Sequence, residues 1–252
     1  MSKTCLIYGV SKGLGKALVE GLGKALVEGL GKALVEGFPE NTDHIYGVSR
    51  SKPPFEQTNF TWIPADLNDI NSANSIKSVI QSQPIHTLIY NVGIWEKLAF
   101  SEEYQFESTD DIELLNMVQT NISACLLNLK ALLPNLRLAK NSKIILIGST
   151  WGLDNHNGKE VTFSATKYAI RGIAQSLRET LREDKIAISV INLGYLATEY
   201  PLTTPVDEVI EKSHGQLIPL QDVVNAVRFI ANTSNATCVK EITMPAMMDT
   251  NV

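Results

Sequence analysis

The chain has 252 residues, of which 44% are hydrophobic and 19% charged, and its formal net charge is −5. This balance fits one globular domain with a sizeable core and argues against a nucleic-acid-binding surface. No apolar run approaches the roughly 18 residues of a membrane span, and no secretory signal precedes the first apolar run. The cysteines are few and widely spaced, which favours reduced thiols over metal ligands and a cytoplasmic setting. They are Cys5, Cys125 and Cys238.

Apolar runs alternate with helical patterns along the whole chain. Strands are predicted at Thr4–Tyr8, His44–Val48, Phe60–Ile63, Thr87–Tyr90, Lys143–Ile147, Ala187–Ile191 and Glu241–Met244. Helices are predicted at 14–37, 69–81, 110–133, 163–183 and 220–232, with loops or short helices at 53–57 and 199–217. Strands that alternate with helices indicate a mainly parallel sheet covered on both faces. We therefore predict a doubly wound, Rossmann-like α/β fold of about seven strands, in one domain spanning residues 1–252.

Residues 13–36 are three consecutive copies of Gly-Leu-Gly-Lys-Ala-Leu-Val-Glu. A strand of about six residues spans some 20 Å, and one copy is enough for a helix to cross back over it. The other sixteen residues are therefore interpreted as an insertion that lengthens the first helix or loops out. The alternative is a long, repetitive surface helix.

A glycine-rich turn follows the first predicted strand and opens the first predicted helix. Glycines permit a tight turn and a close backbone approach, so a phosphate can rest on the amides of the helix N-terminus. The strand–turn–helix setting favours a dinucleotide site over a plain loop. We expect cofactor contacts from Gly9, Ser11, Lys12, Gly13, Leu14 and Gly15.

Two positively charged side chains occupy positions that affect the preference for NADP(H) or NAD(H). Lys12 lies within the turn, and Arg50 follows the second predicted strand, where an acidic residue would instead bind a ribose 2′-hydroxyl. Cations in both places favour a 2′-phosphate. The pair therefore predicts NADP(H) rather than NAD(H), with solvated surface charges as the alternative.

Phe163 and Lys167 stand four residues apart at the start of a predicted helix, so their side chains share one face. A tyrosine at position 163 would place a phenol beside an ammonium. The positive charge would lower the pKa of that phenol and make it a usable proton donor. Phenylalanine has no proton to give.

With these motifs the chain resembles the short-chain dehydrogenase/reductase family, in the form with a Gly-x-x-x-Gly-x-Gly turn. The resemblance covers essentially the whole chain apart from the repeat. It implies further cofactor contacts after the third, fourth and sixth predicted strands. These are Asp66 and Leu67 at the adenine, Asn91, Val92 and Gly93, and Leu193, Gly194 and Thr198 near the nicotinamide.

The resemblance also implies a catalytic set. Asn121 would support a proton-relay water, Ser149 would hydrogen-bond the substrate oxygen, and Lys167 would bind the nicotinamide ribose. Phe163 stands at the position of the catalytic tyrosine. The implied activity is hydride transfer between NADP(H) and a small carbonyl or alcohol. The implied assembly is a homo-oligomer built on the 110–133 and 163–183 helices.

Phe163 leaves three interpretations open. In the first, the substitution inactivates an otherwise competent reductase. In the second, the proton comes from Tyr195, His156 or a water molecule, whereas Tyr168 points about 140° away from Phe163. In the third, the chain is a non-catalytic NADP-binding protein with a regulatory or scaffold role.

The substrate pocket is predicted from aromatic residues that follow strand ends, where folds of this class bind ligands. These residues are Trp95, Trp151 and Tyr195, with Pro201 beside them. Packing of the same loops onto the core is the alternative.

Overall fold

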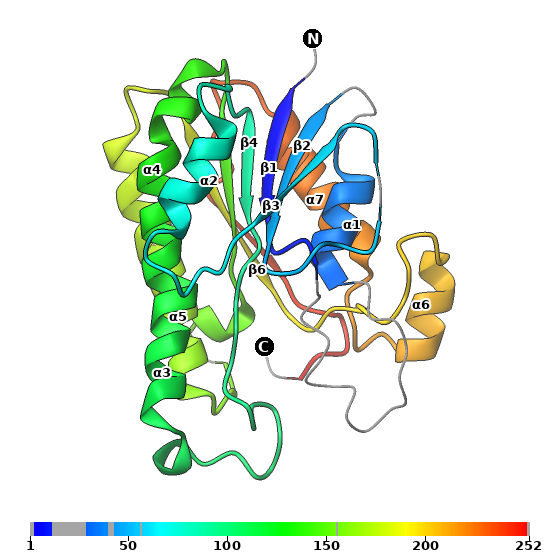
Figure 1. Cartoon of the computed structure of the whole chain (residues 1–252). Coiled ribbons are helices and arrows are strands. Elements are labelled where there is room, and N and C mark those ends of the chain that lie inside the picture. The colour runs from blue at the N-terminus through cyan, green and yellow to red at the C-terminus, as the bar shows by residue number, and fades with distance from the viewer. Residues whose placement is uncertain (1–2, 12–28, 40–42, 56, 155, 251–252) are drawn as a thin grey trace.

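The computed structural model describes residues 3–11, 29–39, 43–55, 57–154 and 156–250. Within these ranges the chain forms a seven-stranded sheet in the order β3-β2-β1-β4-β5-β6-β7 (Figure 1). Every neighbouring pair of strands is parallel. The strands are β1 (Thr4–Tyr8), β2 (His44–Ser49), β3 (Phe60–Pro64), β4 (Thr87–Tyr90), β5 (Lys143–Ile147), β6 (Ala187–Leu193) and β7 (Glu241–Met244). The predicted doubly wound α/β fold is confirmed.

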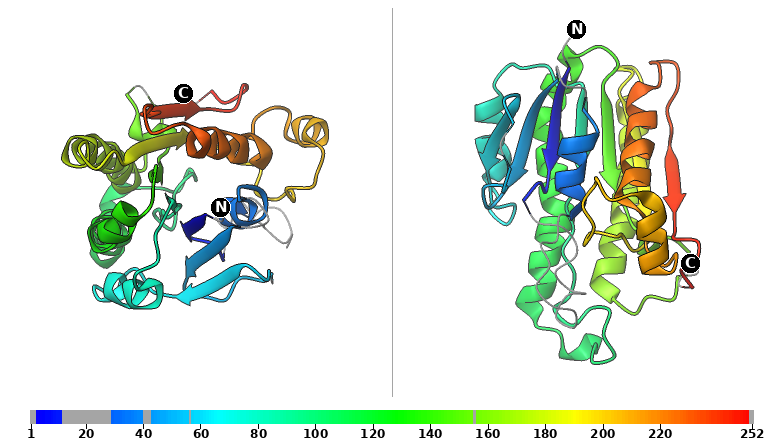
Figure 2. Two further views of the ribbon diagram at one scale, coloured as in Figure 1. Left: turned by 90° about the horizontal axis from the view of Figure 1, so that it is seen from above. Right: turned by 90° about the vertical axis from the view of Figure 1, so that its right-hand side faces the viewer.

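Helices cover both faces of this sheet (Figure 2). They are α1 (Gly29–Gly37), α2 (Ser72–Ile80), α3 (Asp111–Val118), α4 (Ala124–Leu138), α5 (Val161–Thr180), α6 (Val206–Ser213) and α7 (Leu220–Asn232). One buried apolar cluster packs α2, α4 and α5 against the sheet, and a second packs α1 and α7 against the other face. Strands buried on both sides need apolar residues throughout, as β5 and β6 show: every residue in each is buried.

The helix predicted to end at residue 133 continues to Leu138, so that boundary was wrong. Pro134 lies inside α4 and removes one backbone donor. Packing outweighs this loss, because Leu136 is fully buried in the core. The side chain of Asn135 also donates hydrogen bonds to the Gln81 and Gln83 carbonyls, at 2.8 and 2.9 Å, and holds this end of the helix.

The third copy of the repeat forms the described first helix, since α1 begins at Gly29. Residues 12–28 lie outside the described part of the chain. The predicted lengthening or looping-out of the insertion falls there and stays a prediction. Within the described residues, the third copy packs on the sheet through Leu30, Ala33, Leu34 and Val35.

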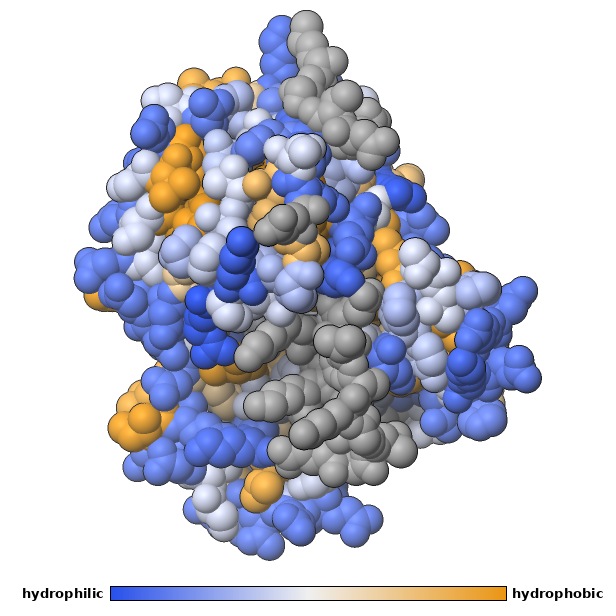
Figure 3. Space-filling model, turned by 45° about the vertical axis from the view of Figure 1, so that its right-hand side comes forward, coloured by the Kyte–Doolittle hydropathy of each residue, from blue (hydrophilic) through white to orange (hydrophobic). Residues whose placement is uncertain are grey.

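The face of the molecule shown in Figure 3 is mainly hydrophilic, with apolar side chains in small separate patches. Among the described helices, none is both long and apolar enough to cross a membrane. Cys5 and Cys125 are buried free thiols, and Cys238 is an exposed one.

Candidate active site

A large cleft opens at the carboxyl ends of β1, β2 and β4, where the strand order reverses between β1 and β4. It encloses about 1,210 Å³ of space, including its open mouth. The structure brings eight of the predicted cofactor residues to this one cleft: Gly9, Ser11, Arg50, Asp66, Leu67, Asn91, Val92 and Gly93. Lys12, Gly13, Leu14 and Gly15 lie outside the described residues. In folds of this class, such a reversal point is where dinucleotides bind.

Two glycines let the backbone come close at the floor of the cleft. Gly9 has φ +77°, and a Cβ placed on it would lie 2.0 Å from the Asn91 carbonyl oxygen. A Cβ on Gly31 would lie 1.9 Å from the Gly9 carbonyl oxygen. A side chain at Gly9 would therefore push the turn away from Asn91, and a side chain at Gly31 would push α1 away from the turn.

Gly31 was missed by sequence reasoning, which assigned the turn to the first copy of the repeat. The three copies are identical, so spacing alone favours the copy that directly follows the strand. Among the described residues, the third copy lies against Gly9 through Gly31. The residues around the cleft thus fit a dinucleotide, with Gly31 in a close-approach role.

Polar side chains line the far end of the cleft, near β2 and β3. The Ser49 hydroxyl donates to the Ser51 carbonyl at 2.8 Å and accepts from Trp62 Nε1 at 3.1 Å. Arg50 is exposed at the same end and forms no ion pair within the described residues. Its guanidinium is therefore available to an anionic group. Ser49 is a further lining residue that sequence reasoning missed.

Lys167 projects from α5 to the junction of this cleft with a second pocket. Its Nζ donates to the Ile147 carbonyl at 3.1 Å and lies 5.4 Å from the centroid of the Phe163 ring. A Cβ on Gly93 would lie 3.1 Å from the same Nζ. Burial lowers the pKa of Lys167 to about 8, because the charged ammonium loses its hydration. Lys167 and Phe163 do share one helix face, as their spacing predicts.

Ser149 ends the loop after β5 and lines the second pocket together with Phe163 and Lys167. Its hydroxyl accepts a hydrogen bond from the Trp151 amide at 3.2 Å, and its own proton stays available to a ligand. The loop packs directly on α5, since a Cβ on Gly152 would lie 2.8 Å from the Lys167 carbonyl carbon. Arg171 holds this contact by donating to the Gly152 carbonyl at 3.0 Å.

Asn121 lies in a π-helical turn, Gln119–Ser123, that interrupts the predicted 110–133 helix between α3 and α4. The Tyr90 hydroxyl donates to the Thr120 carbonyl within this turn at 3.2 Å. Asn121 accepts from the Ile94 amide at 2.9 Å and donates to the Ile94 carbonyl at 2.8 Å and to Thr166 Oγ1 at 3.1 Å. In this arrangement Asn121 ties the loop after β4 to α5.

The N-terminus of α5 is held by side chains from that same loop. Glu96 Oε1 accepts from the amides of Thr162 at 2.9 Å and Phe163 at 3.3 Å. The Tyr104 hydroxyl accepts from the Val161 amide at 3.1 Å. A carboxylate at a helix N-terminus satisfies free donors and complements the helix dipole. Glu96 thus fixes the backbone at position 163, which no local spacing in the sequence reveals.

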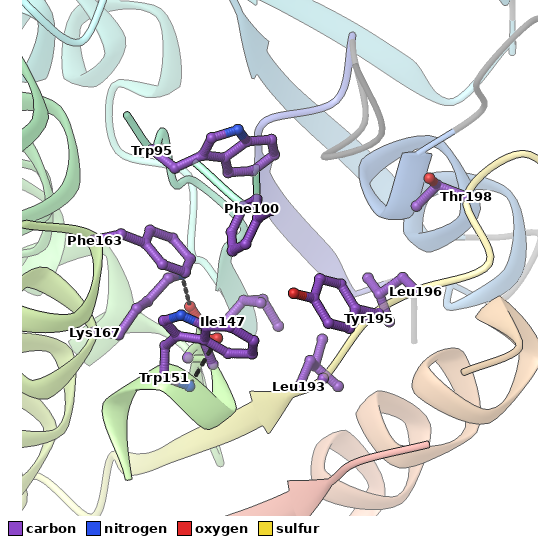
Figure 4. Close-up of a pocket in the computed structure, with 13 residues that line it drawn as sticks. Trp95, Phe100, Ile147, Trp151, Phe163, Lys167, Leu193, Tyr195, Leu196 and Thr198 are labelled. Carbon is purple, nitrogen blue, oxygen red and sulfur yellow. Dashed lines mark hydrogen bonds between the residues drawn. The ribbon is translucent and has the colours of Figure 1, made fainter. Parts of the chain in front are cut away.

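The second pocket is mostly apolar and encloses about 680 Å³ of space, including its mouth (Figure 4). It brings together the predicted Trp95, Trp151 and Tyr195 with Leu193, Gly194 and Thr198. Phe100, which sequence reasoning missed, also lines the pocket and lies between Trp95, Phe163 and Tyr195 in Figure 4. Pro201 is exposed and does not line it.

The three side chains considered as replacement proton sources are placed very differently. His156 Nδ1 accepts from the Gly158 amide and Nε2 lies 3.1 Å from Ser164 Oγ, so both ring nitrogens are engaged away from the pocket. The Tyr168 hydroxyl donates to Asp154 at 3.1 Å on the outside of α5. Tyr195 alone of the three lines the pocket. Burial, with the charges of Glu160 and Asp249, raises the pKa of Tyr195 to about 12.

The described residues contain no group of three or more His, Cys, Asp or Glu side chains placed to hold a metal ion. A parallel sheet in this order, with a glycine-lined cleft where the strand order reverses, defines a Rossmann-type α/β protein. The chain belongs to the short chain dehydrogenase family, whose model matches residues 3–208.

Curated relatives match nearly the full length of the chain, and solved structures share its fold. The 3-oxoacyl-(acyl-carrier-protein) reductase FabG of Escherichia coli is 23% identical over 240 residues, covering 93% of this chain and 91% of the relative. A short chain dehydrogenase family protein from Francisella tularensis has a TM-score of 0.74 at 17% identity, covering 97% of each chain. A tyrosine-to-phenylalanine variant of ElxO with NADPH bound has a TM-score of 0.73 at 20% identity, covering 96% of this chain and 97% of that one.

Proposed function

We propose that this chain transfers a hydride between NADP(H) and a small carbonyl or alcohol, at a rate limited by Phe163. The observation that carries the proposal is that Ser149, position 163 and Lys167 line one pocket beside the glycine-lined cleft. When bound, the cofactor supplies or accepts the hydride. The test compares NADPH oxidation by the native chain and by a Phe163→Tyr variant, over a panel of carbonyl compounds.

Each side chain has a distinct part in this proposal. Ser149 donates a hydrogen bond to the carbonyl oxygen as negative charge develops there. Lys167 binds the nicotinamide ribose, and Asn121 holds the loop after β4 in place. Phe163 passes no proton, and the raised pKa of Tyr195 makes that phenol a weak acid. The proton must therefore come slowly, from Tyr195 or from water.

A non-catalytic NADP-binding role is the alternative. The same experiment separates the two, because tight NADPH binding without turnover in either protein supports the alternative. The solved ElxO variant bears on this choice, since it holds NADPH with a phenylalanine in place of a tyrosine. Proteins of this fold have been solved with NADP or with NAD+, so the cofactor preference needs its own argument.

The preference for NADP(H) rests on Arg50. We expect Arg50→Asp to lower affinity for NADPH, relative to NADH, by about 10- to 100-fold, because charge-assisted hydrogen bonds to the 2′-phosphate are lost. Titration of each reduced cofactor by calorimetry measures this ratio. Lys77→Asp makes the same change of net charge at an exposed position on α2 and should leave the ratio unchanged. An unchanged ratio in Arg50→Asp removes that residue from the site.

The extra repeat copies are expected to be dispensable. Deleting residues 13–28 joins Lys12 to Gly29 and leaves Gly9, Gly29 and Gly31 at the family's spacing. We expect the unfolding free energy to stay within about 1 kcal/mol of the full chain, because loop-closure costs change slowly with length. Denaturant unfolding measures this. A variant that lacks residues 13–20 alone should show the same stability. If either variant is unfolded or no longer binds NADPH, the insertion is required.

We also propose a homo-oligomer built on α3, α4 and α5. Large apolar side chains stay exposed along α3 and α4: Ile112, Leu115, Val118 and Leu126 are 63%, 64%, 41% and 47% exposed. A second copy would bury this stripe. Leu115→Glu is therefore expected to lower the mass measured by light scattering. Ile70→Glu, at a residue 69% exposed outside the stripe, serves as the control. Equal masses for all three proteins would contradict the interface.

A further inference from the structure

Phe100 is the centre of an aromatic cluster that forms the walls of the substrate pocket (Figure 4). Its ring centroid lies 5.8 Å from that of Trp95, 5.7 Å from Trp151, 6.0 Å from Phe163 and 5.9 Å from Tyr195. All four pairs meet edge to face, the preferred geometry of aromatic rings. Five aromatic rings therefore form much of the pocket wall, together with the aliphatic Ile147, Leu193 and Leu196.

The backbone of Phe100 is conformationally strained. Its φ is +64°, a left-handed conformation that side chains with a Cβ rarely adopt. Glu160 compensates, because its Oε1 accepts from the Phe100 amide at 2.8 Å and its Oε2 accepts from Trp151 Nε1 at 2.7 Å. One buried carboxylate thus holds both the Phe100 backbone and the Trp151 ring in position. Strain that is held in this way occurs preferentially at functional sites.

The charges around the pocket disfavour an anion among these rings. Of the described residues that line the pocket, Lys167 is the one charged side chain, and it lies beside Phe163 on α5. The buried Glu160 lies behind Phe100 and Trp151, since it accepts hydrogen bonds from the Phe100 amide and from Trp151 Nε1. Its charge and that of Asp249 both act on the Tyr195 phenol. Among the described residues, a carboxylate or phosphate on the distal part of a substrate would meet no lining cation other than Lys167 and would face the negative charge of Glu160.

We infer that the substrate is an uncharged carbonyl compound bearing a ring, held among the aromatic side chains with its oxygen toward Ser149, and that Phe100 limits the size of that ring. This inference rests on the proposed function for the reacting group. It goes further in assigning the substrate's chemical class and a residue that determines specificity.

Binding measurements test the class without any turnover. Acetophenone, its anionic counterpart phenylglyoxylate and the ring-free acetone are titrated by calorimetry into the native chain with saturating NADP+. Acetophenone is expected to bind at least about tenfold more tightly than either of the others. Equal or tighter binding of phenylglyoxylate or acetone overturns the inference, and so does the absence of measurable acetophenone binding.

Phe100→Ala tests the size limit. Relative to acetophenone, the larger 2-acetonaphthone should gain roughly tenfold in affinity, because removal of the central ring opens the space it needs. Phe106→Ala removes a ring that is 45% exposed outside the pocket and should leave both affinities unchanged. If Phe100→Ala fails to fold, Phe100→Leu replaces it, with a smaller gain expected in the same direction. No gain in a folded variant overturns the role of Phe100.

Turnover by the Phe163→Tyr variant keeps the two proposals separate. Reduction of charged or open-chain carbonyls alone overturns the substrate class and leaves the proposed function standing. Tight acetophenone binding with no reduction of any carbonyl supports the pocket assignment and overturns the proposed function.

Discussion

Phe163→Tyr is expected to raise the kcat/KM of NADPH-dependent carbonyl reduction by about 10²- to 10⁴-fold, the usual contribution of general acid–base catalysis. The reason is geometric. Position 163 lines the pocket that also holds Ser149, and Lys167 Nζ lies 5.4 Å from the existing ring. A hydroxyl added to that ring would enter a site whose cation lowers the pKa of a phenol. The rate of NADPH oxidation, followed by absorbance, measures the gain.

Two controls make this result interpretable. Phe229→Tyr adds the same hydroxyl at a residue 59% exposed on α7 and should leave the rate unchanged. The NADPH dissociation constant should change little in Phe163→Tyr, because the glycine-lined cleft is untouched. A folded variant that binds NADPH but gains no activity on any carbonyl would contradict the catalytic proposal and favour the binding role.

The fold could be predicted because its signals are local. Strands such as β5 are buried on both sides and therefore appear in the sequence as unbroken apolar runs. The residues after those strands gather at one edge of a parallel sheet, and this is why Asp66 and Asn91, far apart in sequence, line the same cleft. Position in the chain was enough to place them together.

The parts that were missed depend on contacts between distant segments. The sequence did not indicate a role for Phe100, because its left-handed backbone is held by a hydrogen bond that its amide donates to Glu160, 60 residues further along. Glu96 caps α5 from a similar separation. Gly31 was missed for a different reason: identical repeat copies carry no information about which of them packs against Gly9. The local sequence pattern therefore predicts the residues of the cleft, whereas the residues that form the pocket walls can be identified only from the folded structure.

Glu96 and Glu160 together explain how the pocket is built. Glu96 accepts from amides at the start of α5, and Glu160, which precedes that helix, accepts from the Phe100 amide and from Trp151. The loop after β4 and the N-terminus of α5 thus each contribute a carboxylate that accepts hydrogen bonds from the other segment. The position of residue 163 and the shape of the pocket depend on the same two carboxylates.

Glu160→Ala is accordingly expected to lower the unfolding free energy by about 3–5 kcal/mol. The substitution leaves the buried Trp151 Nε1 and the half-buried Phe100 amide without an acceptor, at about 1–3 kcal/mol each, and removes support from a strained backbone. Denaturant unfolding measures the loss, and Glu183→Ala, at an exposed glutamate, should stay within about 0.5 kcal/mol of the native chain. Equal stability of Glu160→Ala and Glu183→Ala would mean that the pocket walls hold themselves in place without the carboxylate. In that case the left-handed backbone of Phe100 would have to be maintained by ring packing alone.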